Sequence, residues 1–121
     1  MSQRRPLILV VDDDGPILLL MRSVLREFGF DPIEAGNGAQ AIEEARRSNP
    51  DLILLDRNMP GMSGDEVIRA IRAEPKLGSV PILILSGEPI EPDELEALGA
   101  NGAVLKPFDV TALVATIRKH L

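Results

Sequence analysis

The sequence has 121 residues, a length that supports one well-packed core, and we expect a single domain over residues 1–121. Hydrophobic residues make up 45% and charged residues 26%, as in an ordinary soluble globular protein. The net charge of −6 argues against binding to nucleic acid or to an anionic membrane surface, and the absence of cysteine excludes disulfides and thiolate metal sites. No apolar stretch reaches the length of a signal peptide or a membrane span, so we expect a cytoplasmic protein.

The first part of the chain alternates an apolar run with a helical pattern. LILVV at 7–11 is a near-continuous aliphatic run, which is typical of a strand covered on both faces. Residues 15–28 carry apolar side chains at helical spacing, and Gly29 fits the end of this helix. The weaker run at 31–35 contains Pro32, which has no backbone N–H to donate, so we expect an edge strand there.

The middle of the chain repeats this alternation. A helical pattern at 38–48 precedes the strand-like run LILL at 52–55. Ser63 and Glu66 have the spacing of a capping box, which predicts the start of a third helix. The run VPILIL at 80–85 predicts the next buried strand.

The last part of the chain completes the pattern. Pro92 and Gly99 bracket a helix of barely two turns, and AVL at 103–105 predicts a fifth strand. Residues 109–120 repeat apolar side chains at helical spacing, with Asp109 as the expected N-cap. Five successive strand–helix units predict an α/β fold with an open, doubly wound, five-stranded parallel sheet, (βα)5.

Polar side chains follow four of the predicted strands. In doubly wound sheets the ligand site lies outside the carboxyl ends of the strands, so these side chains are expected to converge. They are Asp12, Asp13 and Asp14 after the first run, Asp56 after the third, Ser86 after the fourth and Lys106 after the fifth.

This set of side chains suits phosphoryl chemistry. Carboxylates without a neighbouring histidine or thiolate favour Mg²⁺. A carboxylate can also attack phosphorus and form an aspartyl phosphate, while a lysine and a hydroxyl hold the transferring oxygens. Each residue alone could be only a helix N-cap, and the acids alone could be a solvated turn. The agreement of four strand ends favours a functional site.

The motifs VVDDD, LLDRNMPGMSG, ILSG and LKPF, at these strand ends, resemble those of receiver domains of two-component response regulators. The resemblance covers essentially the whole chain and implies the flavodoxin-like strand order 2-1-3-4-5. By this resemblance, Asp13 ligates Mg²⁺ directly and Asp12 does so mostly through water. Asp56 is the phosphoacceptor and a metal ligand, and Asn58 offers its backbone carbonyl to the metal.

The resemblance also implies roles for residues around the phosphoryl group. Ser86 senses this group, Lys106 pairs with it, and the Lys106–Pro107 peptide is cis. The implied function is a signalling switch, not a classical enzyme. It accepts a phosphoryl group from a histidine kinase or a histidine phosphotransfer protein, catalyses only this transfer onto Asp56 and its hydrolysis, and acts on a downstream protein. We expect a monomer or weak dimer that binds neither nucleic acid nor membrane through this domain.

Two features depart from the family pattern. Family members usually carry Tyr or Phe three residues before the lysine, where this chain has Ala103. The segment from Ser86 to Lys106 is also shorter than is common. Signalling through this surface should therefore differ from that of typical members.

The first helix offers a partner hypothesis. Leu18, Leu19 and Leu20 lie beside or opposite the apolar stripe centred on Met21, so they exceed what the core needs. They predict a docking patch for the phosphodonor, although they could simply cover the edge of the sheet.

Other functional readings fit less well. Gly36-x-Gly38-x-x-Ala41 has the outline of a dinucleotide-binding motif, but it follows the weak, proline-bearing strand and leaves the acidic cluster unexplained. An Asp-x-Asp phosphatase motif is excluded because residue 58 is asparagine. The main alternative is a receiver-like interaction module that is never phosphorylated.

Overall fold

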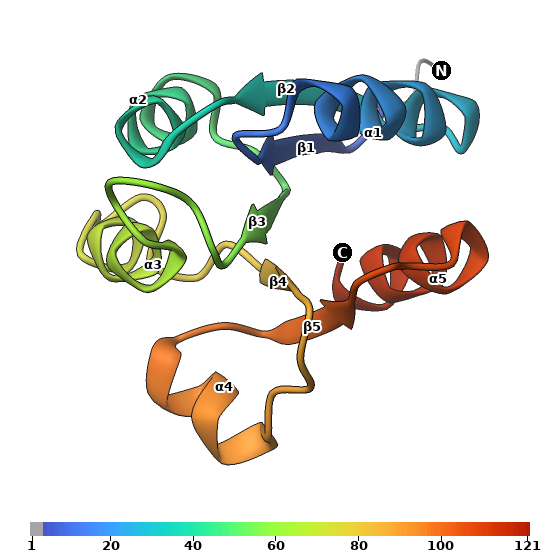
Figure 1. Cartoon of the computed structure of the whole chain (residues 1–121). Coiled ribbons are helices and arrows are strands. Elements are labelled where there is room, and N and C mark those ends of the chain that lie inside the picture. Colours follow the sequence, from blue (N-terminus) through green and yellow to red (C-terminus); the bar gives the residue numbers. More distant parts are fainter. Residues whose placement is uncertain (1–3) are drawn as a thin grey trace.

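The computed structural model describes residues 4–121, which form a five-stranded parallel sheet in the order β2-β1-β3-β4-β5 (Figure 1). This order confirms the predicted doubly wound fold. The strands are β1 (Leu7–Val11), β2 (Asp31–Ala35), β3 (Leu52–Asp56), β4 (Ile82–Ser86) and β5 (Gly102–Leu105). The helices are α1 (Gly15–Glu27), α2 (Gly38–Ser48), α3 (Gly64–Arg72), α4 (Pro92–Leu98) and α5 (Val110–His120).

The strand that carries Pro32 lies at the edge of the sheet. Within the described chain β2 pairs only with β1, so the missing N–H of proline leaves no partner strand unsatisfied. The three strands with the strongest apolar runs, β1, β3 and β4, occupy the centre and are almost completely buried. The hydrophobic pattern thus sorts the strands into edge and centre.

Local sequence signals set the helix ends. Ser63 and Glu66 form the complete capping box at the start of α3. Asp14 caps α1 by accepting a hydrogen bond from the Ile17 N–H at 3.3 Å, and Asp109 caps α5. Gly99 ends α4 in the left-handed conformation, with a φ of 86°, which glycine adopts without strain.

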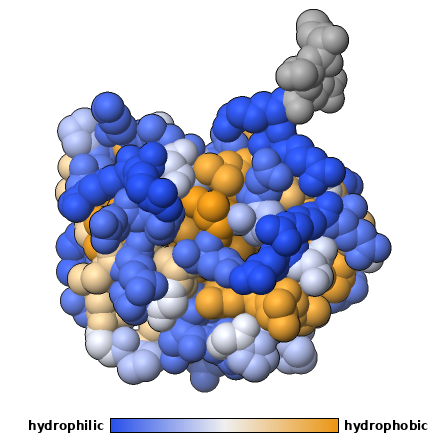
Figure 2. Space-filling model, turned by 90° about the horizontal axis from the view of Figure 1, so that it is seen from above, coloured by the Kyte–Doolittle hydropathy of each residue, from blue (hydrophilic) through white to orange (hydrophobic). Residues whose placement is uncertain are grey.

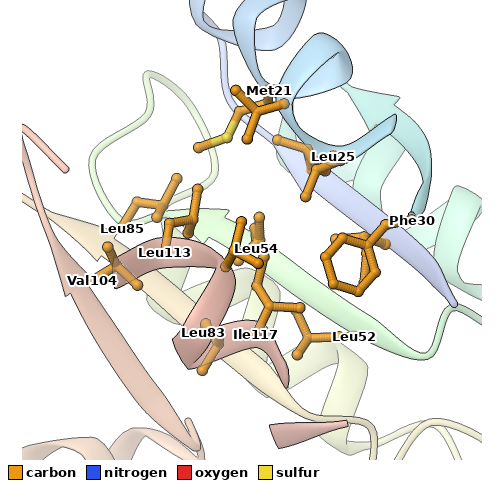
Figure 3. Packing of buried hydrophobic residues seen from close by; sticks show 14 residues of the cluster. Met21, Leu25, Phe30, Leu52, Leu54, Leu83, Leu85, Val104, Leu113 and Ile117 are labelled. Atoms are coloured by element: carbon orange, nitrogen blue, oxygen red, sulfur yellow. The ribbon is translucent and has the colours of Figure 1, made fainter. Parts of the chain in front are cut away.

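The sheet separates two hydrophobic cores. Helices α1 and α5 cover one face and α2 and α3 the other (Figure 1). Successive side chains of a strand point to opposite faces, so Ile8 of β1 belongs to one core and Leu9 to the other. Figure 3 shows Met21 of α1 and Leu113 of α5 near Leu54 of β3 in the first core.

The face drawn in Figure 2 is mainly hydrophilic. Figure 2 shows the face over α1, β2 and α2, where hydrophobic side chains lie in patches between polar ones. None of the helices in residues 4–121 combines the length and apolar character that crossing a membrane requires. The large hydrophobic side chains with the greatest exposure are Leu19, Leu20, Leu105 and Leu121.

Candidate functional site

Three carboxylates converge where β1 and β3 end. These strands are neighbours and pair with Val11 opposite Leu55, so the residues that follow them meet at one edge of the sheet. Carboxylate oxygens of Asp12, Asp13 and Asp56 all lie within 4.8 Å of one another. The structure thus brings together the three acids that the sequence placed at these strand ends.

Asp12 is the most buried of these acids, with 1% of its surface exposed, whereas Asp13 is exposed. Oδ1 of Asp12 accepts a hydrogen bond from the Asp14 N–H at 3.0 Å, but its buried Oδ2 has no hydrogen-bond partner within residues 4–121. Burial raises the pKa of Asp12, and the charge of Asp56 adds to this, while the hydrogen bond from Asp14 opposes it. Asp12 is a buried acceptor that a cation would satisfy.

Asp56 ends β3 with its carboxylate held from two sides. The Asn58 N–H donates to Oδ1 at 3.2 Å, and Nζ of Lys106 lies 3.1 Å from the same oxygen. Nζ also lies 3.8 Å from Oδ2 of Asp12, close enough for an ion pair but too far for a hydrogen bond. In the described chain no hydrogen bond reaches Oδ2 of Asp56, which leaves this oxygen available as a nucleophile.

Ser86 and Lys106 lie side by side at the ends of β4 and β5, where the Lys106 N–H donates to the Ser86 carbonyl at 2.7 Å. The Ser86 hydroxyl donates to the Glu88 carbonyl at 2.8 Å and accepts from the Glu88 N–H at 3.1 Å, which folds the loop after β4. The Lys106–Pro107 peptide is cis, as the resemblance implied.

Arg57 was not identified from the sequence, although a cation directly after Asp56 was a signal that could have found it. Its Nη2 donates to Glu94 of α4 at 3.0 Å and its Nε to Asp65 of α3 at 3.3 Å. Both hydrogen bonds raise the pKa of Arg57. A cavity of about 450 Å³ adjoins this cluster, lined by Arg57, Asn58, Ser86, Gly87, Glu88, Pro89 and Glu94.

The predicted leucine patch on α1 is only partly present. Leu19 and Leu20 are 59% and 50% exposed, but Leu18 packs against the core and does not belong to the patch. A mainly apolar groove of about 420 Å³ begins at this helix and reaches the site lysine, lined by Ile17, Leu20, Lys106, Pro107 and Phe108.

The dinucleotide reading finds no support in the structure. The motif follows the edge strand β2, and a Cβ on Gly38 would lie 2.8 Å from the Met62 side chain and 2.9 Å from Val67. Gly38 therefore allows α2 to pack closely against these side chains, which accounts for the glycine without a ligand.

Comparisons with known proteins agree with this geometry. The family model of the response regulator receiver domain matches residues 8–118. The DNA-binding response regulator MtrA of Mycolicibacterium smegmatis is 42% identical over 100% of this chain and 53% of its own length, so the chain spans about half of that relative. The chemotaxis protein CheY of Pseudomonas aeruginosa is 36% identical over 93% of both chains.

A solved structure shows the same arrangement. The chemotaxis protein CheY4 of Vibrio cholerae superimposes with a TM-score of 0.91 at 32% identity, over 98% of this chain and all of that one. The chain belongs to the family of response regulator receiver domains.

Proposed function

We propose that the chain is a phosphorylation-dependent switch that accepts a phosphoryl group on Asp56. Receiver domains are signalling proteins, not classical enzymes, and response regulators receive their signals from histidine kinases. The observation that carries the proposal is the cluster of Asp12, Asp13 and Asp56 with Lys106 bound to Oδ1 of Asp56. A site that served only to bind proteins would not require carboxylates that are partly buried and repel one another.

The chemistry follows from the free oxygen of Asp56. Its Oδ2 attacks the phosphorus of a phosphohistidine, the new P–O bond forms, and the P–N bond breaks with its electron pair left on the imidazole nitrogen. Lys106 holds Oδ1 and so fixes the carboxylate for attack. Hydrolysis reverses the modification, since water attacks phosphorus and the P–O bond breaks to restore the Asp56 carboxylate.

A divalent cation fits the residues present. The donor set consists of hard carboxylate oxygens, and one of them, the buried Oδ2 of Asp12, lacks a hydrogen-bond partner in the described chain. We assign Mg²⁺ to Asp12, Asp13 and Asp56, with the Asn58 backbone carbonyl as a fourth ligand. When bound, Mg²⁺ would neutralise negative charge on the phosphoryl oxygens.

The phosphodonor is a histidine kinase or a histidine phosphotransfer protein in this proposal. Leu19 and Leu20 are exposed on α1, and the apolar groove at Leu20 continues to Lys106. An apolar donor surface that covered them would bring its phosphohistidine to the edge of the sheet where Asp56 lies. The downstream target is a protein, and the domain itself is a monomer or weak dimer.

The proposal is tested by incubating the chain with acetyl phosphate and measuring its intact mass. With Mg²⁺ present, the chain should gain the mass of one phosphoryl group, and an excess of chelator should prevent this gain. If the mass stays unchanged with Mg²⁺ under trapping conditions, the chain is a receiver-like interaction module instead.

The acidic cluster should also lower the stability of the metal-free protein. Asp12→Asn should raise the free energy of unfolding by about 1–2 kcal/mol, because it removes the charge of a buried carboxylate with an unsatisfied oxygen. Saturating Mg²⁺, at about 100 times its dissociation constant, should stabilise the wild type by about 2.7 kcal/mol and the variant by less. Circular dichroism is the suitable probe of melting because the chain has no tryptophan.

Asp14→Asn is the matched control for this prediction. Asp14 is exposed, and asparagine caps a helix about as well as aspartate does, so this variant should melt like the wild type. A metal-free Asp12→Asn protein that melts below the wild type would show that the Asp12 carboxylate stabilises the fold.

A further inference from the structure

We propose that the Arg57–Glu94 ion pair fastens the N-terminal end of α4, and that phosphorylation of Asp56 releases it. The second half of this inference rests on the proposed function. Residue 103 is alanine, so no aromatic side chain at this position can couple phosphorylation to α4. The inference assigns this coupling role to Arg57.

Helix α4 is weakly held by the hydrophobic core. None of its seven residues is buried, and Leu95 and Leu98 pack only partly against the core on the α2–α3 face. Its N-cap residue, Glu91, makes no side-chain capping hydrogen bond. Figure 1 shows α4 beside β5, at the end of the sheet opposite β2. Polar contacts therefore decide much of its position.

Two arginines supply these contacts, one at each end of α4. Nε of Arg72 donates to the Gly99 carbonyl at 2.9 Å, which anchors the C-terminal end. Nη2 of Arg57 donates to Glu94 at 3.0 Å in the first turn. The side chain of Glu94 is 47% exposed, so this second contact is the more easily broken.

The backbone of Arg57 is held by the sheet and by α3, whereas its side chain is held by ion pairs with Glu94 and Asp65. The Arg57 N–H donates to the Leu85 carbonyl of β4 at 3.1 Å, and its carbonyl accepts from the Gly64 N–H at 3.0 Å. A Cβ on Gly64 would lie 2.8 Å from the Arg57 Cα, so α3 begins in direct contact with this backbone. A change at Asp56 therefore reaches Arg57 through its guanidinium group.

The shared cavity explains why phosphorylation would break the pair. Arg57 and Glu94 both line the cavity of about 450 Å³ that adjoins Ser86 and Asn58. A phosphoryl group replaces the single charge of the Asp56 carboxylate with about two negative charges. These charges attract the guanidinium group of Arg57 and repel the carboxylate of Glu94. Both effects weaken the hold on α4.

Amide hydrogen exchange over residues 91–100 tests the first half of the inference in the unphosphorylated chain. The amides of this segment should exchange about 1.5- to fivefold faster in Glu94→Gln than in the wild type, the range expected for the loss of a partly exposed ion pair. Glu96→Gln removes the same charge from the same helix, and Glu96 forms no ion pair within the described chain, so its exchange should stay unchanged. Equal exchange rates in Glu94→Gln and the wild type would overturn the inference that the Arg57–Glu94 ion pair fastens α4.

Salt gives an independent measurement. At about 1 M salt the Debye length falls to about 3 Å, so exchange over 91–100 should rise in the wild type but not in Glu94→Gln. Arg57→Met should reproduce the fast exchange of Glu94→Gln. The variant that carries both substitutions should exchange no faster over residues 91–100 than either single variant. Additive rates would show that the two residues act independently.

The phosphorylated wild type tests the coupling, with uptake confirmed by intact mass on the same sample. Exchange over 91–100 should rise to the level of Glu94→Gln, and phosphorylated Glu94→Gln should show no further rise. Uptake with unchanged exchange would overturn the coupling alone. Absence of phosphoryl uptake would overturn both the proposed function and the coupling. The salt and Glu94→Gln measurements would still decide whether the Arg57–Glu94 ion pair fastens α4.

Discussion

Asp56→Asn should take up no phosphoryl group from acetyl phosphate and Mg²⁺, under conditions in which the wild type gains one. The substitution keeps the size of the side chain and an oxygen that can accept from the Asn58 N–H. It removes the anionic oxygen that attacks phosphorus, and the amide group is not a comparable nucleophile. Intact mass measures the uptake, and circular dichroism confirms that the variant is folded.

Asp31→Asn provides the matched control for this loss. Asp31 is an exposed aspartate at the start of the edge strand β2, away from the carboxyl ends of the strands. It should gain one phosphoryl group at the wild-type rate. A phosphorylated Asp56→Asn protein would place the acceptor elsewhere, and peptide mapping of the adduct would then identify the residue.

Arg72→Met should lower the free energy of unfolding by about 2–4 kcal/mol, since several carbonyls would lose their donor while the methionine preserves most of the apolar stem. The guanidinium group of Arg72 donates to four backbone carbonyls, at distances between 2.7 and 3.3 Å, and to Oδ1 of Asn101 at 2.9 Å. Burial lowers the pKa of Arg72. The carbonyls belong to Leu77, Gly78, Val80 and Gly99.

The geometry of this site explains why the effect should be large. Asn101 Oδ1 also accepts from the Ile82 N–H at 2.9 Å, so Arg72 supports the start of β4 through this side chain. Arg72→Lys should recover only part of the lost stability, because an ammonium group cannot reproduce the planar fork of donors. Urea unfolding followed by circular dichroism measures both variants.

Arg69→Met serves as the control on the same helix. Arg69 is exposed and makes no ion pair or side-chain hydrogen bond within the described residues, so its replacement should change stability by less than about 0.5 kcal/mol. If Arg72→Met is no more destabilising than Arg69→Met, solvent must satisfy these carbonyls in place of the guanidinium group.

Local sequence patterns were sufficient to predict most of the architecture. Continuous aliphatic runs marked the buried strands, Pro32 marked the edge strand, and Ser63 with Glu66 marked the start of α3. The site was also accessible, because parallel strands place the residues after their carboxyl ends at one edge of the sheet. Asp12 and Asp56 required no more than this rule to be brought together.

Only the tertiary structure determined which of two neighbouring residues of the same type is buried and which is exposed. Asp12 and Asp13 are adjacent and chemically identical, yet one is buried and the other exposed, because Asp12 continues β1 with its N–H bonded to the Ala35 carbonyl of β2, whereas Asp13 lies in the bend beyond it. Similarly, Leu18 and Leu20 both flank the apolar stripe of α1, yet Leu18 packs against the core while Leu20 remains exposed. The orientation of each segment against its neighbours settles such choices.

Arg57 and Arg72 show the clearest limit of the sequence. Each has partners far along the chain, with Arg57 bound to Glu94 across 37 positions and Arg72 to Asn101 across 29. Apolar periodicity and capping patterns act over a few residues, so they determine strands and helices but say nothing of such pairs. A long, flexible arginine side chain can reach many acceptors, so its partners depend on which groups the sheet and helices place near it.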